Sequence, residues 1–199
     1  AVLTAYQLRS GMQGCEGNII YPLDDPYIHL MLAKNVANHG TWGFNPGEFA
    51  SSSSSLLYTL ILSFVAFLFG SSELTPLVVN FISGIILLVV LHRVLLLMKI
   101  SHTVVHLILL GVVFLVPLLS MVVSGMEHTI QLVMNTIYFY FLLEFLSQEE
   151  YRWDSKFYWL CVLSALTVMI RFEGLFFLPL PIIYLLLSRH FGKALFLGV

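Results

Sequence analysis

The stretch LVVNFISGIILLVVL, residues 77–91, carries no charged side chain, and apolar residues continue to position 98 with only His92 and Arg93 intervening. A helix of about 20 apolar residues spans the roughly 30 Å hydrocarbon core of a bilayer, so this run predicts a transmembrane helix. Similar runs follow along the chain, over residues 104–123, 129–146, 157–171 and 174–188, with the start of another at 194. We therefore expect an all-α, polytopic transmembrane helical bundle.

The composition favours the same class. Of the 199 residues, 59% are hydrophobic and only 10% are charged, whereas soluble domains carry roughly 25% charged residues. A net charge of −2 argues against a nucleic-acid partner. Cys15 and Cys161 lie far apart in polar and apolar surroundings, so we expect neither a disulfide nor a metal site from them.

Both chain ends predict a fragment. Residues 1–9 read as the end of a first transmembrane helix, without the basic start or cleavage site of a signal peptide. The last residues begin another apolar run. We expect an N-terminal portion of a longer chain, with a loop over residues 10–76 and transmembrane helices over 77–199.

The loop contains the most unusual polar feature of the chain. Asp24 and Asp25 are adjacent and are two of only three aspartates, and a carboxylate beside lipid is costly unless it has a function. Asp25 as N-cap and Pro26 as first helical residue predict a helix start here. Helix capping is therefore the alternative interpretation of the pair.

Basic residues predict the topology. They cluster in three loops that are separated by two apolar runs each, namely Arg93/Lys99, Arg152/Lys156 and Arg189/Lys193. The positive-inside rule places these loops in the cytoplasm and residues 71–76, 124–128 and 171–174 outside. A helix over 56–69 is only about 21 Å long. If it is shallow or re-entrant, the Asp-Asp loop is external, whereas Arg9 and Lys34 favour a cytoplasmic loop.

Four motifs in order carry a family resemblance: DDPYIHLMLAKN over residues 24–35, FNPGE over 44–48, SGMEHT over 124–129 and RFEG over 171–174. Together they resemble the GT-C superfamily of polytopic membrane glycosyltransferases. The similarity is to the arabinofuranosyltransferase-like and protein O-mannosyltransferase-like branches. Pro26 and Phe172 depart from the family pattern.

The resemblance implies a fold and an activity. The first loop would be extracytoplasmic, would carry membrane-associated helices, and would contribute one acidic residue as general base. The donor would be a polyprenyl-phosphate-linked sugar, transferred with inversion to a glycan, lipid or protein acceptor. The expected location is a bacterial-type inner (plasma) membrane with an extracytoplasmic active site.

Candidate catalytic residues follow from that chemistry. Transfer needs a carboxylate to deprotonate the acceptor hydroxyl, and Asp24 or Asp25 is assigned this role, with the motif match favouring Asp25. Arg171 is the only basic residue predicted outside beyond the first loop, which suits a phosphate clamp. An ion pair with Glu173 or Glu127 explains Arg171 equally well.

Other candidates surround these residues. His29 stands one helical turn after Asp25 and could orient it, although a surface histidine is the simpler interpretation. Lys34 suits lipid phosphate or the headgroup region, and Glu173 completes the substrate-binding set. Glu127 and His128 could bind a divalent cation, Mg²⁺ or Mn²⁺, with the aspartates, while several GT-C enzymes need no metal.

Two other functions remain as alternatives. A secondary transporter would show acids at mid-span and an inverted repeat, whereas here the acids stand at helix ends and no repeat is visible. A non-catalytic scaffold of a membrane complex would tolerate replacement of both aspartates.

Overall fold

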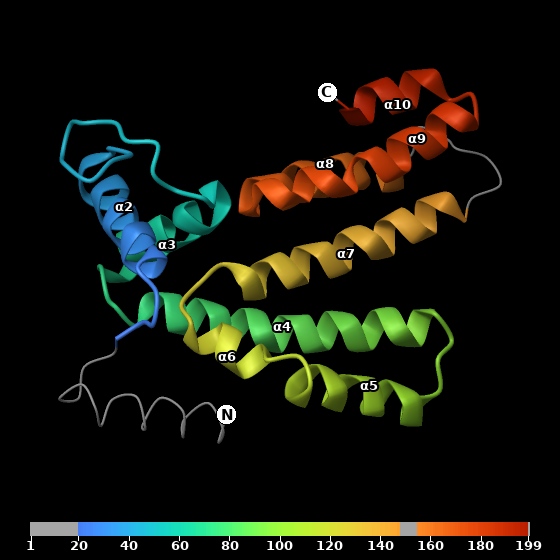
Figure 1. The fold of residues 1–199 in the computed structure, drawn as a ribbon, viewed down its shortest axis with the longest axis horizontal. Helices are drawn as coiled ribbons and strands as arrows, with labels where there is room; N and C mark the ends of the chain where they lie inside the picture. Colours follow the sequence, from blue (N-terminus) through green and yellow to red (C-terminus); the bar gives the residue numbers. More distant parts are fainter. Residues whose placement is uncertain (1–19, 148–154, 199) are drawn as a thin grey trace.

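The computed structural model describes residues 20–147 and 155–198, and every regular element in these ranges is a helix (Figure 1). The predicted all-α class is thus confirmed. The expected end of a helix over residues 1–9 lies outside the described residues.

Two long helices form the centre of the molecule. Helix α4 (Thr75–Leu97) packs along α7 (His128–Leu146), and α8 (Ser155–Ile170) covers the other side of α7 (Figure 1). Among the described helices, α4 and α7 are long and apolar enough to cross a membrane. Asn80, Ser83 and Gly84 line the buried face of α4, and such small or polar residues let helices approach closely.

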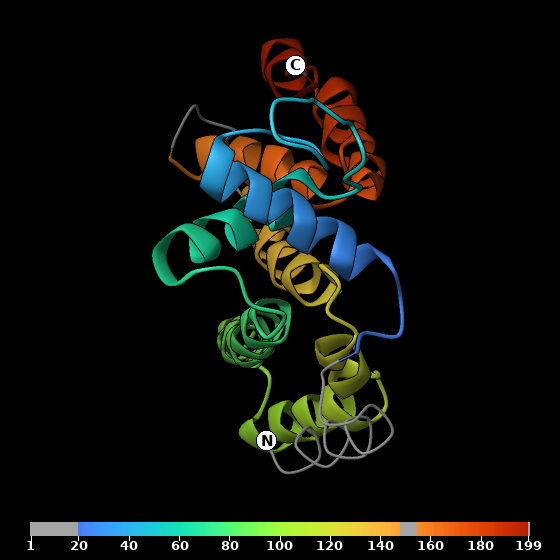
Figure 2. The ribbon, with the colours of Figure 1, turned by 90° about the vertical axis from the view of Figure 1, so that its left-hand side faces the viewer.

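Helices α2 (Asp25–His39) and α3 (Leu56–Phe69) pack against each other as a pair. This pair lies at the end of the long helices where α4 and α7 begin, and α2 crosses in front of α7 and α8 (Figures 1 and 2). Helix α2 ends at Gly40, whose φ of 65° is the left-handed conformation that glycine adopts at low cost.

The predicted run over residues 104–123 is two helices, not one. Helix α5 (His102–Phe114) stops before Pro117, and α6 (Leu118–Val123) restarts after it. Proline lacks the N–H that would continue the helix and restricts the residue before it, so the chain breaks here.

The predicted run over 174–188 is also divided. It forms a 3₁₀ segment, η1 (Phe172–Phe177), followed by α9 (Pro179–Leu187). Proline is tolerated in the first turn of a helix, which explains why α9 begins at Pro179. Helix α10 (Phe191–Gly198) then folds back against α9.

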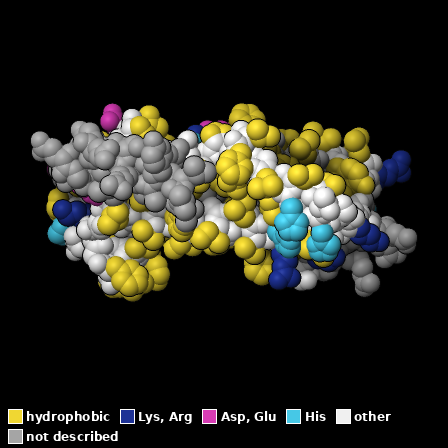
Figure 3. All heavy atoms as spheres, turned by 90° about the horizontal axis from the view of Figure 1, so that it is seen from below, with side chains coloured by type: hydrophobic (Ala, Val, Ile, Leu, Met, Phe, Trp, Pro, Cys, Tyr) yellow, Lys and Arg dark blue, Asp and Glu magenta, His cyan; other side chains and the backbone are white. Residues whose placement is uncertain are grey.

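Hydrophobic side chains cover much of the described part of the face that Figure 3 shows. On α4 alone, Ile82, Ile85 and Val89 are each at least half exposed. Soluble monomers rarely expose large contiguous apolar patches, so this surface suits contact with lipid.

Candidate functional site

The aspartate pair begins α2. Asp24 is the N-cap residue, Asp25 is the first helical residue, and both are exposed. The helix therefore starts one residue before the predicted position. The Asp24 carbonyl accepts hydrogen bonds from the N–H groups of Tyr27 (3.0 Å) and Ile28 (3.2 Å). Its carboxylate makes no capping bond, so side-chain capping does not occupy this group.

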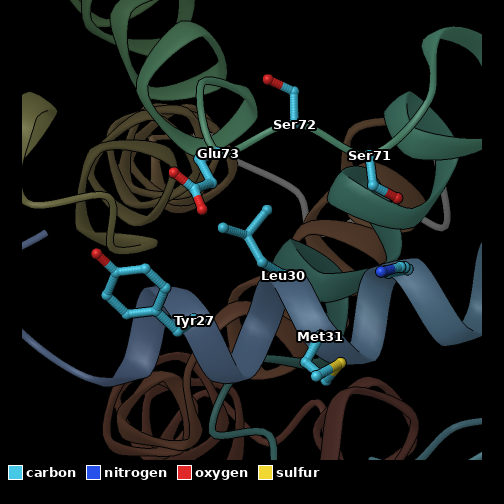
Figure 4. Close-up of a pocket in the computed structure, with 7 residues that line it drawn as sticks. Tyr27, Leu30, Met31, Ser71, Ser72 and Glu73 are labelled. Carbon is cyan, nitrogen blue, oxygen red and sulfur yellow. The ribbon is translucent and has the colours of Figure 1, made fainter. Parts of the chain in front are cut away.

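A groove of about 340 Å³ lies beside the helix that the pair begins. One wall is the stripe Tyr27, Leu30, Met31 and Lys34 of α2, and the other is residues 71–73 of the α3–α4 loop. Figure 4 shows Tyr27 and Leu30 on the side of α2 that faces Glu73. The groove thus combines an apolar wall with two serine hydroxyls, an ammonium group and a carboxylate.

Helix geometry distinguishes the two aspartates. The Asp24 backbone has helical angles, φ −79° and ψ −29°. With 3.6 residues per turn, Asp24 shares a stripe with Tyr27 and Met31, which line the groove. Asp25 lies about 100° further round and shares a stripe with His29, which is buried.

His29 is an interior residue, so its interpretation as a surface histidine was wrong. Its side chain is 1% exposed, because α3 and the start of α7 cover it. The Nδ1 atom lies 2.8 Å from Thr59 Oγ1, and Nε2 lies 3.6 Å from Glu127 Oε2. His29 therefore joins α2 to α3 and to the loop before α7.

Arg171 joins that loop to the end of α8. Its Nη1 donates to Glu127 Oε1 at 2.7 Å, while Nε and Nη2 donate to the two oxygens of Glu173 at 3.1 and 2.6 Å. Nη1 also lies 3.3 Å from His128 Nδ1. The ion pairs proposed for Arg171 are thus present, and the phosphate clamp stays a prediction.

The surroundings of Glu127 and Glu173 favour the ionised form of both carboxylates. Burial opposes ionisation of Glu127, but the nearby His29 and the charge of Arg171 outweigh it and lower the pKa. Hydrogen bonds from Arg171 lower the pKa of Glu173 to about 2. The buried charge of Glu127 is therefore compensated.

Two residues that sequence reasoning missed, Tyr58 and Asn80, hold the 124–127 loop in place. The Tyr58 hydroxyl donates to the Gly125 carbonyl at 2.8 Å, and Asn80 Nδ2 donates to the Met126 carbonyl at 2.7 Å. Gly125 has φ +75°, and a Cβ there would come within 2.5 Å of the Tyr21 ring. Asn80 was detectable, since it is the amide that interrupts the apolar run 77–91.

The structure brings together some of the predicted site residues. His29, Glu127, His128, Arg171 and Glu173 form one network, which we call the polar junction. Lys34 lines the groove, and the aspartates stand at the exposed start of α2.

A metal site stays a prediction. Within the described ranges, no three His, Cys, Asp or Glu side chains are placed to hold a cation. Arg171 also engages one oxygen of Glu127. In this arrangement, Glu127 is an ion-pair partner of Arg171.

Comparisons with protein-family models, with curated proteins and with solved structures found no match to the chain. Functional inference therefore depends on the groove, the aspartate pair and the polar junction.

Proposed function

We propose that the chain belongs to a GT-C-like membrane glycosyltransferase that uses a polyprenyl-phosphate sugar. The observation that carries the proposal is the polar junction. It joins three segments distant in sequence, the helix of the Asp-Asp motif, the 124–128 loop and the 171–174 segment. These are three of the four segments that carry the motif resemblance.

A polytopic arrangement is part of the proposal. Helices α4 and α7 would cross the membrane, and the shorter apolar helices α8 and α5 with α6 would add further passes. The polar junction lies where α4 and α7 begin, whereas Arg93 and Lys99 lie where α4 ends. The positive-inside rule then places the junction on the extracytoplasmic face of a plasma membrane.

The reaction would proceed in one displacement. An aspartate of the pair accepts the proton of the acceptor hydroxyl, whose oxygen then forms a bond to the anomeric carbon of the sugar. The bond from that carbon to the phosphate oxygen breaks with inversion, and polyprenyl phosphate leaves with the electron pair. The ammonium of Lys34 and the hydroxyls of Ser71 and Ser72 would bind this phosphate in the groove.

The choice between the aspartates is a testable part of the proposal. The motif match favours Asp25. Helix geometry favours Asp24, because Asp24 shares a stripe with Tyr27 and Met31, which line the groove, whereas Asp25 shares one with the buried His29. The polar junction would act indirectly, by holding α2 against the bundle.

Transfer assays in membranes test the proposal. The full-length protein is assayed with a panel of polyprenyl-phosphate sugars, as wild type and as Asp24→Asn and Asp25→Asn. Loss of the base should reduce transfer by about 100- to 10,000-fold in one variant. The matched control is Glu48→Gln, which replaces an exposed acid of the same loop that bonds only Asn45 among the described residues.

The control variant should keep wild-type activity. Wild-type rates in both aspartate variants would overturn the catalytic assignment and would instead fit a scaffold.

A further inference from the structure

A second groove opens at the other end of α4. It lies between α4 and α5, has a volume of about 590 Å³, and is lined by Leu88, Val89, His92, Arg93, Leu96 and Leu109. Figure 3 shows histidine and Lys/Arg side chains gathered at this end of the molecule, among hydrophobic side chains. We call this the hairpin groove.

The charged residues of the α4–α5 segment that forms the hairpin groove have a single sign. No acidic residue occurs between Glu73 and Glu127, whereas Arg93 and Lys99 fall in that stretch and are exposed. At the same end of the bundle, Glu144 of α7 is paired with Lys156 at 3.3 Å. Within residues 20–147 and 155–198, no ion pair engages Arg93 or Lys99, so both can meet an anion from outside the chain.

Histidines add hydrogen-bonding groups at the same place. The rings of His92 and His106 lie 6.2 Å apart across the two helices. His106 Nδ1 lies 2.6 Å from the His102 carbonyl oxygen. This contact fixes the imidazole ring, and Nε2 lies on the side of the ring away from it. His92 itself lines the groove.

The walls of the hairpin groove are apolar. Leu88, Val89, Leu96 and Leu109 form them, and the neighbouring Leu97 and Leu107 are exposed. A free phosphate would gain nothing from such walls, whereas a lipid would bury acyl chain against them. Basic pockets between transmembrane helices on the cytoplasmic side suit anionic headgroups.

We propose that the hairpin groove binds an anionic diacyl phospholipid of the cytoplasmic leaflet. The phosphate would lie at Arg93 and His92, with Lys99 adding charge, and an acyl chain would lie along Leu88 and Leu109. This inference requires that α4 spans the membrane. It does not require glycosyl transfer.

Native mass spectrometry of the detergent-solubilised chain tests the inference. Phosphatidylglycerol and phosphatidylcholine with identical acyl chains are titrated separately. Each cation contributes about 5-fold to binding of an anionic lipid, so Arg93→Gln/Lys99→Gln should lose about 25-fold of the preference for phosphatidylglycerol. Arg189→Gln, an exposed cation at the α9–α10 turn, serves as control and should keep the preference.

A second variant separates a groove from general surface charge. Leu109→Trp keeps every cation but fills the space between the helices, so it should weaken phosphatidylglycerol binding. Inorganic phosphate should not compete. The inference is overturned if wild type binds both lipids equally, if the double variant keeps its preference, or if Leu109→Trp binds as wild type.

A failure of the lipid-binding inference can be distinguished from a failure of the glycosyltransferase proposal. Asp24→Asn should bind phosphatidylglycerol as the wild type does, because the aspartate pair and the hairpin groove lie at opposite ends of α4.

Discussion

Arg171 stabilises the buried carboxylate of Glu127 at the start of the apolar helix α7. Glu127 is fully buried, and an isolated ionised carboxylate in such a place would be very costly. Arg171 pairs with Glu127 and holds Glu173 in a bidentate arrangement. Because these bonds occupy most of its N–H groups, we assign Arg171 a positioning role in the free protein.

The ion pairs predict how stability depends on pH. The pKa of Glu173 is about 2 in the folded chain against an ordinary 4.5, and the pKa of Glu127 is also lowered. A depressed pKa stabilises the fold fully above the unfolded value, and this contribution is lost as pH falls through the folded value. The wild-type melting temperature should therefore fall as pH drops from about 4.5 towards 2.

Thermal unfolding of wild type and Glu173→Gln in detergent, from neutral pH down to a pH of about 2, tests this dependence. The variant should melt lower than wild type near neutral pH, and its melting temperature should fall less at acid pH. Parallel pH profiles for the two proteins would contradict a contribution from this pair.

At the scale of the element, the side of the membrane on which the Asp-Asp loop lies depends on whether α3 crosses the bilayer. Helix α3 is 14 residues long, shorter than the roughly 20 residues that span a bilayer. Its buried residues include Tyr58, Leu62 and Ala66, while Phe64 and Phe67 on other faces are mostly exposed. A short helix with one face on protein and aromatic side chains outward suits a position within one leaflet.

Thiol labelling of intact cells tests this position of α3. Glu48→Cys and Ser72→Cys are made separately in a Cys15→Ser/Cys161→Ser background, so that the 199-residue sequence carries one thiol in each variant. If α3 does not cross the membrane, an impermeant reagent added outside should label both positions. Labelling of position 72 alone would mean that α3 crosses and that the Asp-Asp loop is cytoplasmic.

The sequence predicted where helices lie along the chain but not which polar side chains they bury. The lengths of the apolar runs identified α4 and α7, because a membrane-spanning helix is recognised from a sufficiently long stretch of apolar residues alone. The break at Pro117 was missed because run length ignores backbone hydrogen bonds, although the proline itself was visible. The burial of His29 could not be foreseen, because its partners Thr59 and Glu127 are 30 and 98 positions away along the chain.

At the scale of the whole molecule, the α2–α3 pair is attached to the long helices by one apolar cluster and by polar contacts. Among the described residues, the attachment includes apolar contacts of Ala33, Tyr58 and Leu62 with Ile130 and Ile170. It also includes the hydrogen bond from Tyr58 to the Gly125 carbonyl and the ion pairs and hydrogen bonds of the polar junction. Cooperative units of a protein can open separately. The polar junction should therefore control whether α2 stays beside the groove.

Arg171→Gln tests this control. The substitution leaves Glu127 buried without its cation, and breaking a buried pair in this way costs about 3 to 5 kcal/mol. Amide hydrogen exchange should accelerate in α2 and α3, while the centre of α4 keeps its protection because it packs on α7. Uniform acceleration over all helices, or none in α2, would contradict a local role.

The double variant Glu127→Gln/Arg171→Gln completes the test. It removes the uncompensated charge together with the cation, so much of the protection of α2 should return. Glu173→Gln serves as the matched single change, because its side chain is 54% exposed and such exposed pairs contribute only about 0 to 1 kcal/mol. If the double variant exchanges as fast as Arg171→Gln, apolar packing and not charge compensation holds α2 in place.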